Sequence, residues 1–172
     1  MFIQNLSLIG FMGSGKSTIG KMLADKLNFL FLDTDKLIEY IQGTTISEIF
    51  KQHGENFFRE IESKVIKKIY NNKNCVFACG GGVFCTAENI EIIRENSFVV
   101  YLHMSEPEAY ERLKDVKDRP LLLKEADLKQ KIAQMMNVRK DIYKNNCDLE
   151  IDINRKSPDL IAQDIIDYLK MH

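Results

Sequence analysis

Near the start of the chain, residues 10–17 read Gly-Phe-Met-Gly-Ser-Gly-Lys-Ser and fit the phosphate-binding pattern GxxxxGK[ST]. This pattern constrains the fold, because the loop needs a strand before it and a helix after it. Both are predicted: residues 6–9 form a short apolar strand, and Ile19, Leu23 and Leu27 recur at helical spacing. The alternative is a glycine-rich surface turn, which would not need a strand before it and a helix after it.

Each residue type in the loop has a chemical use. The glycines let successive backbone N–H groups turn inward around phosphate groups. Lys16 supplies positive charge for the β- and γ-phosphate oxygens, and the Ser17 hydroxyl is a ligand for Mg²⁺. We therefore expect a nucleotide-phosphate site over residues 10–18. The expected contacts are Gly13, Ser14, Gly15, Lys16, Ser17 and Thr18.

Further apolar runs alternate with segments of helical period along the chain. The strand-like runs cover residues 6–10, 29–32, 75–79, 98–103 and 148–153. This alternation is typical of a parallel sheet with helices on both faces. It predicts a doubly wound α/β domain with five parallel strands in a three-layer α/β/α arrangement.

Composition narrows the class of protein. A length of 172 residues fits one domain. The chain has 24 Lys and Arg against 25 Asp and Glu, a net charge of −1, which gives no electrostatic reason to expect nucleic acid or an anionic membrane. We find no leader segment and no bilayer-spanning apolar stretch, which predicts a soluble, cytoplasmic protein. The four cysteines form no CxxC pair, which favours small buried thiols in a reducing compartment over a zinc site or a disulfide framework.

Two stretches between the strands stand out. Residues 35–71 read as two or three helices, with a capping-box pattern at Thr45 and Glu48 and a break at Gly54. So long a connection favours a binding insertion, with a plain extended crossover as the alternative. The second, residues 114–120, is charged and without period, which suggests a flap that closes over bound nucleotide.

In an open α/β sheet, ligands bind beyond the carboxyl ends of the strands. Asp33 and Asp35 follow the second strand, where one carboxylate can support Mg²⁺ and the other can grip or deprotonate a hydroxyl. The alternative is that Asp35 only caps the next helix. The triple glycine at residues 80–82 follows the third strand and allows close backbone approach to a ligand, unless it is a flexible turn.

Two arginines lie outside the phosphate loop. Arginine recognises carboxylates through paired planar hydrogen bonds, so Arg59 and Arg139 favour an acceptor that carries an anionic group. Glu62, three residues after Arg59, can share a helix face with it and hold its guanidinium. For either arginine alone, a solvated surface position is the alternative.

Together these residues resemble the shikimate kinase family, within the nucleoside-monophosphate-kinase-like branch of P-loop proteins. The resemblance covers nearly the whole chain, and the set is more specific than any single motif. It comprises the phosphate loop, Asp33-Thr34-Asp35, Phe57-Phe58-Arg59 with Glu62, Gly80-Gly81-Gly82, Arg119-Pro120-Leu121-Leu122, Arg139 and Asn154-Arg155. Cys79 and Phe84, which flank the glycines, depart from the usual pattern.

The resemblance implies a P-loop kinase fold and transfer of the γ-phosphoryl group of ATP to the 3-hydroxyl of shikimate, a step toward chorismate and the aromatic amino acids. ATP and Mg²⁺ are the implied co-substrate and metal, and shikimate is the small-molecule partner. We expect a monomer without nucleic-acid or membrane partners. A single domain over residues 1–172 is implied, with a substrate-binding insertion at about 35–62 and a lid at about 113–126.

The resemblance also implies residue roles. Asp35 would bind the ring hydroxyls, either as a base or as an orienting group. Arg59 and Arg139 would clamp the substrate carboxylate. The remaining implied roles are Mg²⁺ ligation by Ser17 directly and by Asp33 through water, phosphate contact by Arg119 from the lid, adenine contact by Arg112 and Arg155, and lining of the substrate pocket by Gly80, Gly81 and Gly82.

Other functions remain open at this point. A gluconate kinase or a nucleoside-monophosphate kinase would keep the phosphate loop, although a polyol acceptor would leave Arg59 and Arg139 unexplained. A GTPase-like switch would usually carry DxxG and NKxD segments. We find neither, since the nearest match, Asn-Lys-Asn-Cys at residues 72–75, lacks the aspartate.

Overall fold

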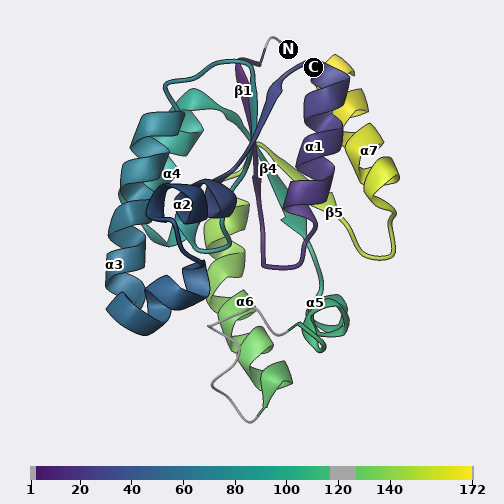
Figure 1. The fold of residues 1–172 in the computed structure, drawn as a ribbon. Coiled ribbons are helices and arrows are strands. Elements are labelled where there is room, and N and C mark those ends of the chain that lie inside the picture. Colours follow the sequence, from purple (N-terminus) through teal and green to yellow (C-terminus); the bar gives the residue numbers. More distant parts are fainter. Residues whose placement is uncertain (1–2, 117–126, 172) are drawn as a thin grey trace.

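The computed structural model describes residues 3–116 and 127–171. Strands and helices alternate along the described chain, which confirms the predicted α/β class (Figure 1). In chain order the elements are β1 (Asn5–Ile9), α1 (Lys16–Leu27), β2 (Leu30–Asp33), α2 (Thr34–Gln42), α3 (Ile46–Ile69), β3 (Cys75–Ala78), the 3₁₀ turn η1 (Val83–Cys85), α4 (Ala87–Asn96), β4 (Phe98–His103), α5 (Glu106–Leu113), α6 (Leu128–Asn145), β5 (Leu149–Asp152) and α7 (Pro158–Met171).

The strands form one 5-stranded sheet in the order β2-β3-β1-β4-β5, and neighbouring strands are parallel. In the central strand, β1, Leu6 pairs with Val76 of β3 and with Phe98 of β4. Each predicted strand agrees with the observed one to within one residue at either end. Because all strands run the same way, their carboxyl ends share one edge of the sheet, where ligands bind in this class of fold.

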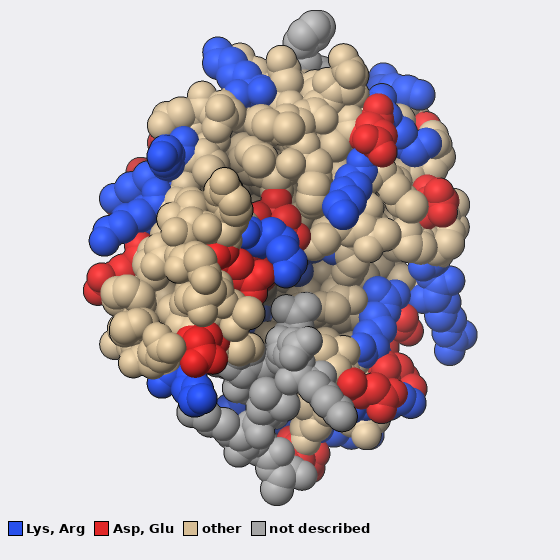
Figure 2. Space-filling view, in the orientation of Figure 1, with Lys and Arg blue, Asp and Glu red and all other residues tan. Residues whose placement is uncertain are grey.

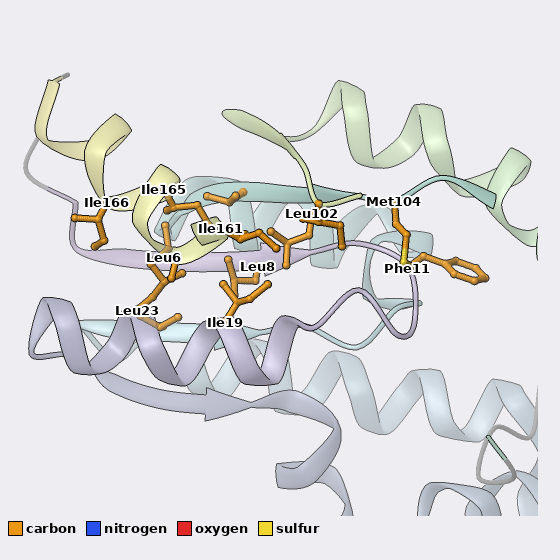
Figure 3. Packing of buried hydrophobic residues seen from close by; sticks show 14 of the residues in the cluster. Leu6, Leu8, Phe11, Ile19, Leu23, Leu102, Met104, Ile161, Ile165 and Ile166 are labelled. Atoms are coloured by element: carbon orange, nitrogen blue, oxygen red, sulfur yellow. The ribbon is translucent and has the colours of Figure 1, made fainter. Parts of the chain in front are cut away.

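Helices cover both faces of the sheet. Figure 1 shows α1 and α7 together on one side and α3 and α4 on the other. Side chains of β1 alternate between the two faces, as expected for a strand with period 2. Leu6 and Leu8 pack with α1 and α7 (Figure 3). Ile9 belongs to the cluster on the opposite face and packs with α3. The core on the α1 and α7 face includes Ile19, Leu23, Ile161, Ile165 and Leu169.

The long connection after β2 consists of α2 and α3. Gly54 interrupts α3 with φ 81° and ψ 179°, a conformation that favours glycine, so the predicted break is confirmed. The predicted cap is confirmed as well, because the Thr45 hydroxyl accepts a hydrogen bond from the Glu48 amide at 3.2 Å. The connection therefore contains the two or three helices that the sequence predicts.

The surface charges and the cysteines can be compared with what the composition predicts. On the face drawn in Figure 2, basic and acidic side chains are interspersed. Among the described residues, no helix is long and apolar enough to cross a membrane. The four cysteines are free thiols; Cys75 and Cys79 are buried, but Cys85 is exposed, so the expectation of buried thiols is wrong there.

Candidate active site

The loop between β1 and α1 has the backbone that its glycines permit. Gly13 and Gly15 have φ of 78° and 86°, values that other residues rarely adopt. Gly15 immediately precedes α1, so the amino end of that helix borders the loop. Backbone N–H groups at such a helix end attract phosphate, and the loop therefore suits an anionic ligand.

Lys16 lies over this loop. Its Nζ donates hydrogen bonds to the carbonyl oxygens of Gly10 and Phe11, each at 2.9 Å. These bonds hold the ammonium group against the loop backbone, where a phosphate would approach. Gly13, Gly15, Lys16, Ser17 and Thr18 line a cavity of about 230 Å³ at this position.

Ser17 and Asp33 join the phosphate loop to the end of β2. The Ser17 hydroxyl donates to Oδ2 of Asp33 at 2.5 Å. Hydroxyl and carboxylate oxygens are the hard ligands that Mg²⁺ prefers. The described residues contain no cluster of three or more His, Cys, Asp or Glu that could hold a metal. The pair of Ser17 and Asp33 suits Mg²⁺, which keeps several waters and takes further ligands from substrate phosphates.

Asp33 and Asp35 have different structural positions. Oδ1 of Asp33 accepts from the Lys36 amide at 3.1 Å, so Asp33 is the residue that caps α2. The alternative that Asp35 caps this helix is therefore wrong. Asp35 lies in the first turn of α2, and its carboxylate is so close to Gly80 that a Cβ at that glycine would overlap it.

A second, larger cavity of about 610 Å³ adjoins the phosphate cavity. The two share part of their lining, namely Met12, Ser17, Asp33, Asp35 and Gly81. The larger cavity is also lined by Arg59 and Glu62 of α3 and by Arg139 of α6. A phosphate compartment thus lies directly beside a compartment that contains two guanidinium groups.

Arg59 enters the larger cavity from α3. It donates to Oε2 of Glu62 at 2.7 Å and to Oε1 of Glu55 at 2.9 Å. The predicted support by Glu62 is confirmed, and Glu55, four residues before Arg59, is an addition that helical spacing could have indicated. An arginine anchored in this way differs from the solvated surface side chain of the alternative.

The carboxylate of Glu62 is 1% exposed. Burial raises its pKa to about 7, although the Arg59 guanidinium acts in the opposite direction. Oε1 of Glu62 has no hydrogen-bond partner among the described residues. The acceptor side of the larger cavity therefore contains a carboxyl group whose charge depends on pH near neutrality.

The triple glycine is anchored on both sides, unlike a flexible turn. The Gly80 amide donates to the Thr34 hydroxyl at 2.8 Å. Gly82 has φ of −110°, which any residue could adopt, but a Cβ there would overlap the Arg59 guanidinium. At Gly80 a Cβ would overlap Asp35 instead. These glycines are therefore required by the space that the two side chains occupy.

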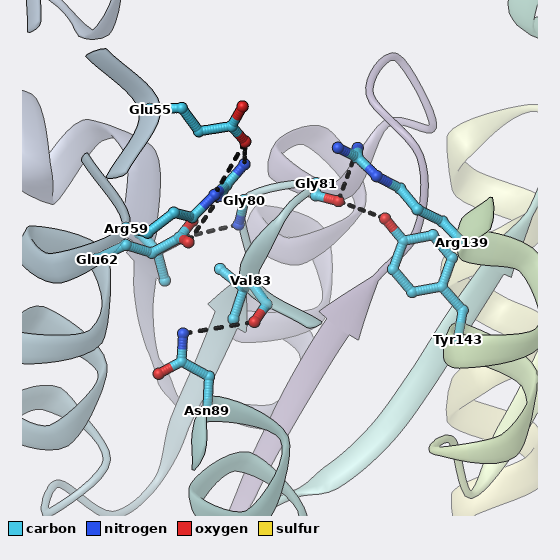
Figure 4. Close-up of polar contacts among 10 residues, drawn as sticks. Glu55, Arg59, Glu62, Gly80, Gly81, Val83, Asn89, Arg139 and Tyr143 are labelled. Atoms are coloured by element: carbon cyan, nitrogen blue, oxygen red, sulfur yellow. Dashed lines mark hydrogen bonds and ion pairs between the residues drawn. The ribbon is translucent and has the colours of Figure 1, made fainter. Parts of the chain in front are cut away.

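Gly81 faces α6. Its carbonyl oxygen accepts hydrogen bonds from Nη1 of Arg139, at 3.1 Å, and from the Tyr143 hydroxyl. Figure 4 shows Arg59 and Arg139 on opposite sides of the glycine segment. Arg139 is 8% exposed, so it is a buried residue and not the surface arginine of the alternative.

The structure describes both of the predicted adenine residues but not the predicted lid arginine. Nη1 of Arg112 donates to the Gly13 carbonyl at 3.3 Å, so this arginine lies beside the phosphate loop. Arg155 is exposed in the loop after β5, with φ of 56°. Arg119 and most of the predicted lid lie outside the described residues, whereas Val116 lines the larger cavity.

Some neighbours of the site were not predicted. Tyr143 is one, although its spacing of four residues from Arg139 places both on one face of a helix. Thr45, Ile46, Ser47 and Phe50 also line the larger cavity; they lie within the predicted insertion at about 35–62, although none was named as a site residue. The capping pattern at Thr45, which marks the start of a helix, could have indicated these residues.

Comparison with known proteins assigns this architecture. Residues 12–170 match the family described as shikimate kinase. A shikimate kinase of Sulfurihydrogenibium sp. (strain YO3AOP1) is 42% identical over 168 residues, which cover 98% of this chain and 99% of that protein. One from Caldicellulosiruptor bescii is 43% identical over 164 residues, which cover 95% of this chain and 94% of that protein.

A solved structure agrees in fold and sequence. It is described as a shikimate kinase from Acinetobacter baumannii in complex with shikimate, has a TM-score of 0.94 to this chain and is 34% identical to it. The alignment covers 98% of this chain and 94% of that one. Since the family match spans nearly the whole sequence, the chain belongs to the shikimate kinase family.

Proposed function

We propose that the protein transfers the γ-phosphoryl group of ATP to the 3-hydroxyl of shikimate, giving shikimate 3-phosphate and ADP. One observation carries this proposal: the phosphate cavity and the cavity with two arginines share a wall that includes Asp35 and Gly81. A nucleotide phosphate and a small hydroxylated carboxylate can therefore meet at Asp35. Family membership and the solved relative in complex with shikimate support the same pair of substrates.

The donor half is the phosphate loop. Its backbone N–H groups and Lys16 would hold the β- and γ-phosphates, with contacts from Gly13, Ser14 and Gly15 in the loop and from Thr18 in the first turn of α1. Mg²⁺, held by Ser17 directly and by Asp33 through water, would neutralise charge on the transferred group when bound. Arg112 and Arg155 would flank the adenine, and Arg119 would contact the phosphates from the lid.

The acceptor half is the larger cavity. Arg59 and Arg139 would clamp the shikimate carboxylate, because paired guanidinium groups match its planar charge. Glu55 and Glu62 hold Arg59 in place by the hydrogen bonds described above. Gly80, Gly81 and Gly82 would line the pocket, and Asp35 would bind the ring hydroxyls.

The chemical step needs position and charge more than covalent help. The 3-hydroxyl oxygen forms a bond to the γ-phosphorus as the bond to the β-bridging oxygen breaks, and ADP leaves. Asp35 would orient this hydroxyl or accept its proton. Lys16 and Arg119 would stabilise the negative charge that shifts toward the β-phosphate.

The wider expectations accompany this proposal. We propose a single domain over residues 1–172, with a substrate-binding insertion at about 35–62 and a lid at about 113–126. A monomer in the cytoplasm, without nucleic-acid partners, stays a prediction. The location and the lack of nucleic-acid partners follow from the composition and the near-neutral net charge.

The direct test is an ADP-release assay on the purified protein with ATP and Mg²⁺. Shikimate, quinate, gluconate and nucleoside monophosphates are compared as acceptors at equal concentrations. We expect ADP formation that depends on shikimate. Equal turnover with gluconate or a nucleoside monophosphate would overturn the proposal, and slow acceptor-independent hydrolysis would favour a nucleotide switch.

A further inference from the structure

Two side chains of α6 converge on one backbone oxygen in the glycine segment. Arg139 and Tyr143, four residues apart, both donate to the carbonyl of Gly81. A carbonyl oxygen has two lone pairs, so these two donors use its full capacity. The Gly81 carbonyl is thus fixed to consecutive turns of the same helix.

The position of Tyr143 is also set by packing of its ring against two other aromatic rings. Its ring centroid lies 5.3 Å from that of Tyr101 and 6.4 Å from that of Phe84. The side chain is 3% exposed, and burial raises the pKa of its hydroxyl, which stays protonated and remains a donor at neutral pH. A buried phenol without an acceptor would be costly, so this hydrogen bond is strongly favoured.

Gly81 lies close to both the phosphate loop and Arg139. A Cβ on Gly81 would lie 3.5 Å from the Met12 amide nitrogen and 3.8 Å from Nη1 of Arg139. The guanidinium of Arg139 is aligned by its hydrogen bond to the Gly81 carbonyl oxygen, so movement of this oxygen would shift the guanidinium. Arg59 differs, because two carboxylates on its own helix hold it.

We propose that Tyr143 is a positioning residue for the acceptor clamp: its hydroxyl fixes the Gly81 carbonyl, which in turn aligns Arg139 for the substrate carboxylate. This inference rests on the proposed function, since the clamp is defined by a shikimate carboxylate. It adds a residue that never touches the substrate. We expect a larger effect on the acceptor than on ATP, because the Gly81 carbonyl accepts from Arg139, which lines the larger cavity and not the phosphate cavity.

Tyr143→Phe tests the proposal, because it removes the hydroxyl and keeps the packed ring. We expect the KM for shikimate to rise about three- to tenfold, as for loss of one hydrogen bond, with kcat and the KM for ATP within about twofold of wild type. Tyr101→Phe is the matched control: it removes a hydroxyl from the neighbouring ring and should leave all three constants unchanged.

The double variant Arg139→Ala/Tyr143→Phe separates positioning from general stability. If Tyr143 acts through Arg139, its substitution adds no further rise in the KM for shikimate once Arg139 is absent. An equal rise in both backgrounds would overturn the proposal. So would an unchanged Tyr143→Phe, or one that loses shikimate and ATP affinity together with a lowered Tm.

The proposed function and the role of Tyr143 can be tested separately. A wild-type protein without shikimate-dependent ADP formation would overturn the proposed function and this inference with it. An active wild type with any of the contrary Tyr143→Phe results would overturn the inference alone.

Discussion

The guanidinium of Arg59 lies 2.7 Å from the carboxylate of Glu62, which is 1% exposed. One member of this pair, the Glu62 carboxylate in the wall of the acceptor cavity, binds a proton unusually tightly. Burial raises the pKa of Glu62 from 4.5 to about 7. The folded protein therefore binds this proton more tightly than the unfolded chain does.

The stability of the protein should reflect this proton. Between pH 4.5 and about 7 the folded state keeps a proton that the unfolded state has lost, so this group lowers the free energy of unfolding as pH rises. In Glu62→Gln that part of the slope should vanish. Denaturant unfolding would measure this: as pH rises through this range, the free energy of unfolding of the wild type should fall by about 1–3 kcal/mol relative to that of the variant.

Glu55→Gln is the control for this measurement, because it removes the exposed partner of the same guanidinium. It should keep the wild-type pH slope. A difference between wild type and Glu62→Gln that is constant with pH would contradict the assigned proton affinity.

Gly82→Ala should weaken the binding of the acceptor while the protein still folds. A Cβ at this position overlaps the Arg59 guanidinium, whose flexible end can move away only by leaving its two carboxylates. We expect the KM for shikimate to rise about 10- to 100-fold, as for a lost hydrogen bond to a charged group, and the Tm to fall because buried Glu62 loses its guanidinium partner. In an Arg59→Ala background the same substitution should add little, and an additive loss would place its effect elsewhere.

Lys16→Ala should abolish turnover. Loss of a charge aimed at the transferred phosphoryl group costs about 10³-fold or more in kcat. Circular dichroism and Tm would establish that the fold persists. Lys26→Ala, at the opposite end of α1, serves as the control for loss of a lysine. A near-normal kcat for Lys16→Ala would rule out the assignment of the phosphate loop.

Arg139→Ala should affect shikimate far more than ATP. Its guanidinium lines the larger cavity, and lysine cannot reproduce the planar fork. We expect the KM for shikimate to rise about 10- to 100-fold, with Arg139→Lys recovering only part of the loss. Steady-state kinetics with each substrate varied in turn would measure this, and equal losses for both substrates would count against the clamp.

Arg119→Ala concerns a residue outside the described structure. If the lid brings this arginine to the phosphates mainly in the transition state, kcat falls by about 10²-fold or more while the KM for shikimate changes little. Initial rates at saturating ATP would measure both. An unchanged kcat would remove Arg119 from the mechanism.

The fold could be predicted because its signals are local. Strands buried on both faces are short apolar runs, and in this chain polar or glycine residues close them, as at Gly10 and Asp33. Helix starts are equally local, since Thr45 bonds the amide of Glu48 three residues later. The strand ends accordingly agree with the structure to within one residue.

The site could be predicted only where its contacts are close in sequence or where strand ends meet. Glu62 was expected beside Arg59 because helical neighbours share a face. The contact of Tyr143 with Gly81 spans 62 positions, and no local pattern encodes it. Which of Asp33 and Asp35 caps α2 depended on where the helix begins, and residue type alone does not fix that.

The wall shared by the two cavities limits how such an enzyme can be redesigned. Met12, Ser17, Asp33, Asp35 and Gly81 border both compartments, so a substitution there that reshapes room for a new acceptor also disturbs the nucleotide. Thr45, Ile46, Ser47 and Phe50 border only the larger one. New acceptor specificity is therefore best sought at the start of α3, where libraries can vary side chains while the ATP side stays intact.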